Sequence, residues 1–379
     1  MKITFISLVI LWEILACTSL PFSGYAGERG KEVVLKLTPG TDNPRNSEGD
    51  FITLKDGSIL FVYTHYTGIS SSDHATAYLA GRFSHDKGKS WDPVDHLVLG
   101  NEGKMNIMSV SLLRLGNGDI ALFYLRKNSV TDCIPMVRFS KDEARTWSEP
   151  IRCINDRTGY FVLNNHRVIQ LKNGRLLMAV AYHGNISGDR KNRLGSAWSY
   201  YSDDSGINWK PGSEAVNPDS VVIQEPGVVE LKDGRIMMWM RTNAGVQYQS
   251  FSNDGGVNWC PANRSNIISP LSPAAIDRIP KTGDLLLVWN NNDQSDPASK
   301  GKRTPQSVAI SKDDGITWEK IQNIESDPDG WYCYTAVHFS GSSLLLGYCA
   351  GSQQKKTYLS ETDIVRIPLS RIYRPKRIK

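Results

Sequence analysis

The sequence predicts an all-β protein folded as a six-bladed β-propeller. Its 379 residues include 32 Gly, 18 Pro and 10 Trp, a composition that favours strands joined by tight turns. A short pattern, Ser-x-Asp-x-Gly-x-x-Trp, recurs along the chain, and so does a pair of apolar strands joined by a glycine turn. Recurring units of four short strands are typical of propellers.

The first 26 residues have the pattern of a signal peptide. Lys2 precedes an apolar run over residues 4–20, and Gly24 and Ala26 are small residues at the positions that a signal peptidase reads, so cleavage after Ala26 is expected. We therefore expect an exported protein, secreted or periplasmic. Cys17 follows Ile-Leu-Ala, as in a bacterial lipobox, so a lipid anchor on Cys17 is the alternative. Residues 27–379 are expected to form one propeller, without a membrane-spanning segment.

Each predicted blade begins with a hairpin. An inner strand leads through a glycine turn, mostly Asn-Gly or Asp-Gly, into a second and more apolar strand. A third strand follows, and in five units the recurring box leads to a fourth. The last unit lacks a box, and the early strand 32–37 is expected to complete it and so to close the ring. The six hairpins are residues 48–63, 109–124, 165–180, 225–240, 272–289 and 334–348.

The recurring box is expected to be structural. Its Asp can accept hydrogen bonds from the turn's backbone, its Gly can adopt a conformation that a Cβ disfavours, and its Trp can fold back on the strands. One copy has Ala144 in place of Gly. The five copies are residues 84–91, 140–147, 202–209, 252–259 and 311–318.

The charge of the chain argues against a nucleic-acid partner. Lys plus Arg is 44 and Asp plus Glu is 39, a net charge of +5. Five of the cationic side chains lie within residues 371–379, which contain no acid. Nucleic-acid binding needs a basic stripe over the folded surface, which this distribution does not provide.

The cysteines suggest no metal site. Cys333 and Cys349 lie equally far from residue 341, so a hairpin would set them side by side, as a disulfide or as two buried thiols. Neither Cys-x-x-Cys nor His-x-x-x-His occurs. No metal and no cofactor is therefore expected.

The box is similar to the Asp-box of bacterial neuraminidases, and residues 27–379 resemble the sialidase superfamily in its BNR-repeat-like branch. The resemblance implies an exo-α-sialidase, which removes terminal sialic acid from glycans with retention of configuration. The anomeric carbon of such a substrate carries a carboxylate, so the nucleophile is a Tyr rather than an acid. The family site also needs an arginine cluster for that carboxylate, a Glu that activates the Tyr, and an Asp as general acid/base.

The resemblance assigns four residues by their place in the repeat. Glu225 opens an inner strand and Arg241 ends the next, so both lie at one edge of a blade. Arg303 precedes a third strand, where the family has another carboxylate-binding arginine, although Lys300 to Arg303 could equally be a solvated basic run. Tyr334 opens the last inner strand as the expected nucleophile. Tyr332 is its rival, because residues two apart face the same side of a strand.

The remaining assignments come from the first and third units. Asp73, in a Ser-rich loop, matches the acid/base Asp. Arg45 is the candidate for the first arginine of the triad, but it lies about two residues out of register, and Glu48 occupies the register of Glu225. Asn165 and His166 begin the third inner strand and could contact the N-acyl or glycerol arm of the sugar.

Three hypotheses follow. The leading one is an exo-α-sialidase acting on sialylated glycans. The second is a glycosidase or lyase that acts on another acidic sugar, which the displacement of Arg45 favours. The third is a glycan-binding propeller without catalysis, which needs no paired Tyr334 and Glu225. Convergence of the assigned residues at one end of the ring separates a built site from a chance pattern.

Overall fold

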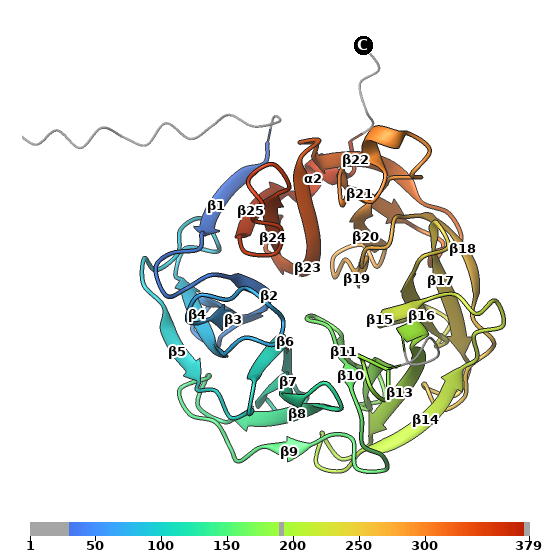
Figure 1. The fold of residues 1–379 in the computed structure, drawn as a ribbon, viewed down its shortest axis with the longest axis horizontal. Coiled ribbons are helices and arrows are strands. Elements are labelled where there is room, and N and C mark those ends of the chain that lie inside the picture. Colours follow the sequence, from blue (N-terminus) through green and yellow to red (C-terminus); the bar gives the residue numbers. More distant parts are fainter. Residues whose placement is uncertain (1–29, 189–192, 375–379) are drawn as a thin grey trace, which may run out of the picture.

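The structure, a computed structural model, describes residues 30–188 and 193–374. Six antiparallel sheets are arranged in a ring around a central axis (Figure 1). Each sheet is one blade, and one of its edge strands, the inner strand, lies nearest the axis (Figure 1). The predicted six-bladed all-β propeller is confirmed.

The blades follow the order of the chain. Blade 1 contains β2 (Asn46–Thr53), β3 (Ile59–Tyr66), β4 (Ala77–Ser84) and β5 (His96–Leu99). Blade 2 contains β6 (Asn106–Arg114), β7 (Ile120–Ser129), β8 (Asp132–Ser140) and β9 (Ile151–Arg152). Blade 3 contains β10 (Phe161–Val162), β11 (Val168–Gln170), β12 (Leu176–Tyr182), β13 (Ser196–Ser202) and β14 (Lys210–Ala215). Blade 4 contains β15 (Ile223–Glu230), β16 (Ile236–Thr242), β17 (Val246–Ser252) and β18 (Asn263–Ile268). Blade 5 contains β19 (Ala275–Arg278), β20 (Leu285–Asn290), β21 (Gln306–Ser311) and β22 (Glu319–Glu325). Blade 6 contains β23 (Gly330–Ser340), β24 (Ser343–Ser352), β25 (Thr362–Pro368) and β1 (Glu32–Leu37), and the short helix α2 (Leu369–Ile372) follows β25.

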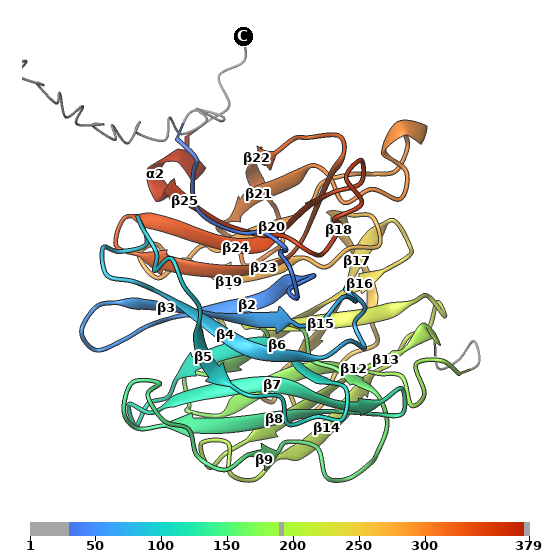
Figure 2. The same cartoon turned by 60° about the vertical axis from the view of Figure 1, so that its left-hand side comes forward.

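Blade 6 closes the ring with strands from both parts of the chain. β1 pairs antiparallel with β25, from Glu32 opposite Arg366 to Leu37 opposite Thr362, and the two strands lie side by side in both views (Figures 1 and 2). The predicted closure by strand 32–37 is therefore confirmed. The predicted signal peptide and Cys17 lie outside the described residues. Within the described part of the chain, no helix is long and apolar enough to cross a membrane.

The boxes form the turns between the third and fourth strands. In the first, the Ser84 hydroxyl accepts the backbone N–H of Gly88 at 2.8 Å, and Asp86 accepts the N–H groups of Lys89 and Ser90 at 2.9 Å. In all five copies the box Ser donates to the box Asp and accepts an N–H four residues on. These groups satisfy one another locally, which fits the structural role predicted for the box.

The hydrophobic core lies between neighbouring blades. Its largest cluster joins side chains of blades 1, 2 and 3, such as Leu60, Phe123 and Met178, all fully or almost fully buried. Burial of apolar surface against both neighbours makes each blade depend on the next. This packing between blades holds the inner strands in a ring around the axis.

Most inner strands share an unusual feature near their first residues. Glu48, Ser109, Glu225 and Tyr334 have φ between 47° and 61°, the left-handed region that side chains seldom adopt. Each coincides with a break in strand register, as between Ser47 and Asp50. These are β-bulges, which re-aim a side chain and occur near functional sites. All four residues line the same cavity.

Candidate active site

A cavity of about 340 Å³ lies at the beginnings of the inner strands. Its lining includes the four left-handed residues, together with ionic groups and apolar side chains. Of the predicted residues, Asp73, Glu225, Arg241, Arg303 and Tyr334 all line it. The structure therefore brings together residues from blades 1, 4, 5 and 6, at one end of the ring.

Tyr334, Glu225 and Arg241 form a hydrogen-bonded chain. The Tyr334 hydroxyl donates to Oε1 of Glu225 at 3.0 Å, and Nη1 of Arg241 donates to the same oxygen at 2.7 Å. Each of the three residues is at most 9% exposed. The second oxygen, Oε2 of Glu225, has no hydrogen-bond partner among the described residues. A buried, unpaired carboxylate oxygen is costly unless a ligand or proton meets it.

The charges around this chain keep the carboxylate ionised. Burial alone would raise the pKa of Glu225, but Arg241 and Arg303 outweigh it, so its pKa lies below the usual range. Burial and the charge of Glu225 raise the pKa of Tyr334 well above that of free tyrosine. Tyr334 is therefore a neutral phenol whose proton points at an ionised base.

Arg303 lies on the other side of Tyr334. Its guanidinium is 5.6 Å from the centre of the Tyr334 ring and 5.0 Å from that of Trp331. Nη1 of Arg303 donates to Sγ of Cys333 at 3.0 Å. Cys333 is opposite Cys349 in the strand register, and both are buried free thiols. Of the two alternatives left open by the sequence, the thiol pair is the one observed.

Tyr332 is separated from this site by the bulge. The register shift between Cys333 and Ala336 breaks the alternation that would set residues 332 and 334 on one face. Tyr332 instead lines another cavity with Lys31, and its ring is 6.2 Å from that of Tyr348. The expectation that both tyrosines face the same side was wrong, and the geometry favours Tyr334.

Asp73 stands on a loop that is anchored from blade 2. Nζ of Lys127 donates to the Asp73 carbonyl at 2.7 Å, and the Asn106 amide donates to the same carbonyl at 2.9 Å. The carboxylate pairs with Arg45, and its side chain is 55% exposed. Burial raises the pKa of Asp73, but the charge of Arg45 outweighs this and lowers it overall. The backbone is thus fixed while the carboxylate remains within reach of a ligand.

Arg45 is not placed as the sequence predicted. Its side chain is almost fully buried, and Cζ of its guanidinium lies 4.6 Å from the centre of the Tyr66 ring. Nε donates to Ser47 at 2.9 Å, Nη1 to Asp73, and Nη2 to Glu48 at 3.4 Å. These partners occupy every guanidinium nitrogen. Arg45 therefore supports the wall from behind, and Glu48 is the group on the wall itself.

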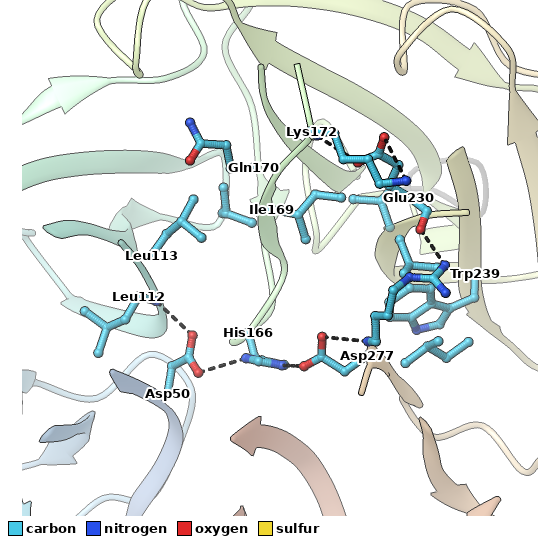
Figure 3. Close-up of a pocket in the computed structure, with 15 residues that line it drawn as sticks. Asp50, Leu112, Leu113, His166, Ile169, Gln170, Lys172, Glu230, Trp239 and Asp277 are labelled. Atoms are coloured by element: carbon cyan, nitrogen blue, oxygen red, sulfur yellow. Dashed lines mark hydrogen bonds and ion pairs between the residues drawn. The ribbon is translucent and has the colours of Figure 1, made fainter. Parts of the chain in front are cut away.

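His166 lies in a second cavity of about 330 Å³. This cavity is further along the same inner strands, since it is lined by Asp50 and Leu112, whereas Glu48 and Ser109 line the first. Figure 3 shows His166 between two carboxylates, with 2.8 Å to Asp50 and 2.7 Å to Asp277. His166 therefore does not line the cavity that holds Tyr334 and Glu225.

Asn165 is also engaged within the protein. Its amide nitrogen donates to the carbonyl of Gly49 at 2.8 Å and to that of Tyr334 at 3.0 Å. It ties the third inner strand to the backbone of the expected nucleophile. Its amide nitrogen is thus bound to backbone, and Asn165 does not line the cavity.

The cavity has further polar residues that sequence reasoning did not assign. Ser109 and Glu48 share the bulge position of Glu225, and superposing the repeat units would have indicated both. Lys127 also lines the cavity, but its place in the repeat does not indicate this. Asn164 presents an Nδ2 without a partner among the described residues, while its Oδ1 accepts the N–H of Asn165 at 2.9 Å. Asn164, rather than Asn165, is the amide that faces the cavity.

Comparison with known families matches the BNR repeat-like domain to residues 103–346, well over half of the chain. The chain belongs to the BNR repeat-like domain family. A sialidase of Vibrio cholerae is 29% identical to this BNR-repeat propeller over an alignment of 170 positions, which covers 36% of the chain and 22% of that sialidase. The chain thus matches about a fifth of the length of its curated relative.

Several solved structures, sialidases among them, have a fold similar to that of the BNR-repeat propeller. A protein of unknown function from Dyadobacter fermentans has a TM-score of 0.69 at 18% identity, covering 90% of this chain and 100% of its own. A Hadza microbial sialidase has a TM-score of 0.68 at 18% identity, covering 87% and 66%. An intramolecular trans-sialidase from Ruminococcus gnavus, solved with oseltamivir carboxylate, has 0.69 at 14% identity, covering 89% and 97%. At these identities the likeness is one of fold.

Proposed function

We propose that this protein is an exported exo-α-sialidase, a glycoside hydrolase that releases terminal sialic acid with retention of configuration. The observation that carries the proposal is the buried chain from Tyr334 to Glu225 and Arg241. A neutral phenol donating to an ionised carboxylate is a nucleophile with its base already in place. The family membership and the sialidases among the solved relatives support the same reaction class.

In the proposed mechanism, Arg241 and Arg303 attract the substrate carboxylate. Tyr334 attacks the anomeric carbon while its proton passes to Glu225, and the glycosidic bond breaks. Asp73 protonates the leaving oxygen and afterwards deprotonates the water that cleaves the tyrosyl intermediate, while Glu225 returns its proton to the departing oxygen of Tyr334. Arg45 orients Asp73 through their ion pair, and Asp73 takes up from solvent the proton that it passes to the leaving glycosidic oxygen.

The test compares two tyrosines in hydrolysis of a fluorogenic sialoside. Tyr334→Phe is expected to lower kcat/KM by about a thousandfold, because it removes the nucleophile and nothing else. Tyr332→Phe is the matched control and should retain most of the activity. Equal turnover by both variants would contradict the proposal. Sialic acid binding without turnover in the wild type would identify a lectin instead.

Asp73 is tested by changing the leaving group. A general acid matters most when the leaving group is a sugar and least when it is an acidic phenol. Asp73→Asn should therefore lose activity about a hundredfold more on a sialyl disaccharide than on an aryl sialoside. An equal loss on both substrates would remove Asp73 from the acid role.

A second candidate function is hydrolysis of another acidic sugar. Glu48 on the wall, with Arg45 withdrawn behind it, favours this alternative. A glycan panel in which a uronic acid but no sialoside is turned over would establish it.

A further inference from the structure

Glu48 occupies a position where an anionic substrate would meet it. It lines the cavity together with Arg241 and Arg303, is 6% exposed, and has the same left-handed bulge conformation as Glu225. Its only cationic hydrogen-bond partner among the described residues is Arg45, at 3.4 Å, a long contact. A carboxylate here would repel a substrate carboxylate, with little solvent to screen the repulsion.

We propose that Glu48 is a specificity-determining residue, which makes the site bind an acidic sugar together with one proton. Protonated Glu48 can donate a hydrogen bond to the sugar carboxylate, beside the guanidinium groups of Arg241 and Arg303. Ionised Glu48 excludes the same ligand by like-charge repulsion. The proton comes from solvent, so affinity for the sugar falls as the pH rises. This inference rests on the acidic-sugar substrate of the proposed function.

The surroundings of Glu48 make such proton uptake feasible near neutral pH. Burial raises the pKa of Glu48 to about 7, although Arg45 acts against it. Charged and titratable groups approach from every neighbouring element. They are Tyr66 of β3, Asp73 of the following loop, Lys127 of β7, Tyr160 before β10, Glu225 of β15 and Cys349 of β24.

Cys333 is the competing proton acceptor. Burial would raise its pKa, but hydrogen bonding to Cys349 and the charge of Arg303 lower it to about 7. An arriving carboxylate that drew Arg303 away could drive protonation of this thiolate instead. An experiment on Glu48 therefore needs a Cys333 variant beside it.

The test is calorimetric titration of the whole protein with free N-acetylneuraminic acid, in two buffers of different ionisation enthalpy. The heat difference between the buffers gives the protons taken up per sugar bound. At about pH 8 the wild type should take up about one proton and bind about tenfold more weakly than at about pH 6. Glu48→Gln should bind without uptake, and equally at both pH values. Cys333→Ala should keep the uptake of the wild type.

The other possible results of the titration contradict either the role of Glu48, the proposed hydrolase, or both. Uptake that survives Glu48→Gln, or disappears in Cys333→Ala, overturns the role of Glu48. If Glu48→Gln fails to fold, the proton uptake of the wild type decides the question. Binding by the wild type without proton uptake then overturns the inference. Binding with uptake but without sialoside hydrolysis overturns only the proposed hydrolase, whereas hydrolysis with pH-independent binding overturns only this inference. Absence of binding by wild type and Glu48→Gln at both pH values overturns both.

Discussion

His166 connects three blades that are not neighbours. Its ring nitrogens reach Asp50 of blade 1 and Asp277 of blade 5 from the start of blade 3. Burial would lower the pKa of His166, but the two carboxylates outweigh it and raise the pKa to about 10. The residue is therefore an imidazolium that bridges the middle of the ring.

This bridge predicts a pH-dependent stability. Because the folded pKa of about 10 lies above the unfolded value of about 6.5, the bridge stabilises fully below about pH 6.5 and is lost as the pH rises through 10. His166→Gln should lower the free energy of unfolding by roughly 1–3 kcal/mol at about pH 6. The deficit should shrink towards about pH 10, as followed by urea denaturation.

His96 provides the control for the bridge. It pairs with Asp92 at 2.9 Å, but 46% of its side chain is exposed. His96→Gln should change the stability by less than about 0.5 kcal/mol at either pH, as exposed ion pairs contribute little. A deficit of His166→Gln that stays constant with pH would contradict the charged bridge.

At this scale the sequence predicts which residues meet, but less well which way they face. The resemblance to the sialidases assigned Asp73, Glu225, Arg241, Arg303 and Tyr334, and all five line one cavity. Arg45 and His166 do not line this cavity, because backbone conformation decides the direction of their side chains. In blade 3 the left-handed residue is His166, one position later than Glu225 in blade 4. The alternation of side chains along a strand does not predict such a shift of the bulge by one residue.

The glycine of the Asp-box is present in four of the five copies. Four copies have glycine with φ between 81° and 92°, at Gly88, Gly206, Gly256 and Gly315. The copy in blade 2 has Ala144, with φ of 65°. A left-handed alanine is strained by about 1 kcal/mol relative to glycine. The hydrogen bonds of the box hold it there nonetheless.

Ala144→Gly is therefore expected to stabilise the protein. The gain should be up to about 1 kcal/mol, because relief of strain exceeds the added freedom of the unfolded chain. The reverse change, Gly206→Ala, is the matched control and should destabilise, since its Cβ would meet Phe139 at 3.0 Å. Urea midpoints of both variants measure this. A lower midpoint for Ala144→Gly would show that the alanine contributes packing that outweighs its strain.

The elements themselves were predictable because each carries its own signal. Hairpins follow from apolar strands around glycine turns, and boxes follow from side chains that satisfy their own turn. Blade 3 departs from the pattern, since its inner strand is split into β10 and β11, both paired with β12. Residues 163–167 between them carry Asn165 and His166, whose long-range partners the local sequence does not specify.

For the whole molecule, β1 holds the ring closed. Leu37 is 4% exposed and packs in a cluster with Phe51 and Ile364, which links β1 to blades 1 and 6. Leu37→Ala should lower the free energy of unfolding by about 2–4 kcal/mol. Val33→Ala, at 39% exposure on the same strand, should cost less than about 1 kcal/mol. Equal losses in thermal or urea unfolding would show that β1 does not close the ring through this contact.

The closing blade makes the polypeptide's two described ends neighbours. An added Cβ on Gly30 would lie 3.4 Å from Arg371, at the far end of the chain. A short linker could therefore join the ends, and new termini could be opened in the loop of another blade. Such a circular permutant would keep every strand pair and the whole candidate site. The cavity depends on the ring of inner strands, and that ring does not depend on where the backbone is cut.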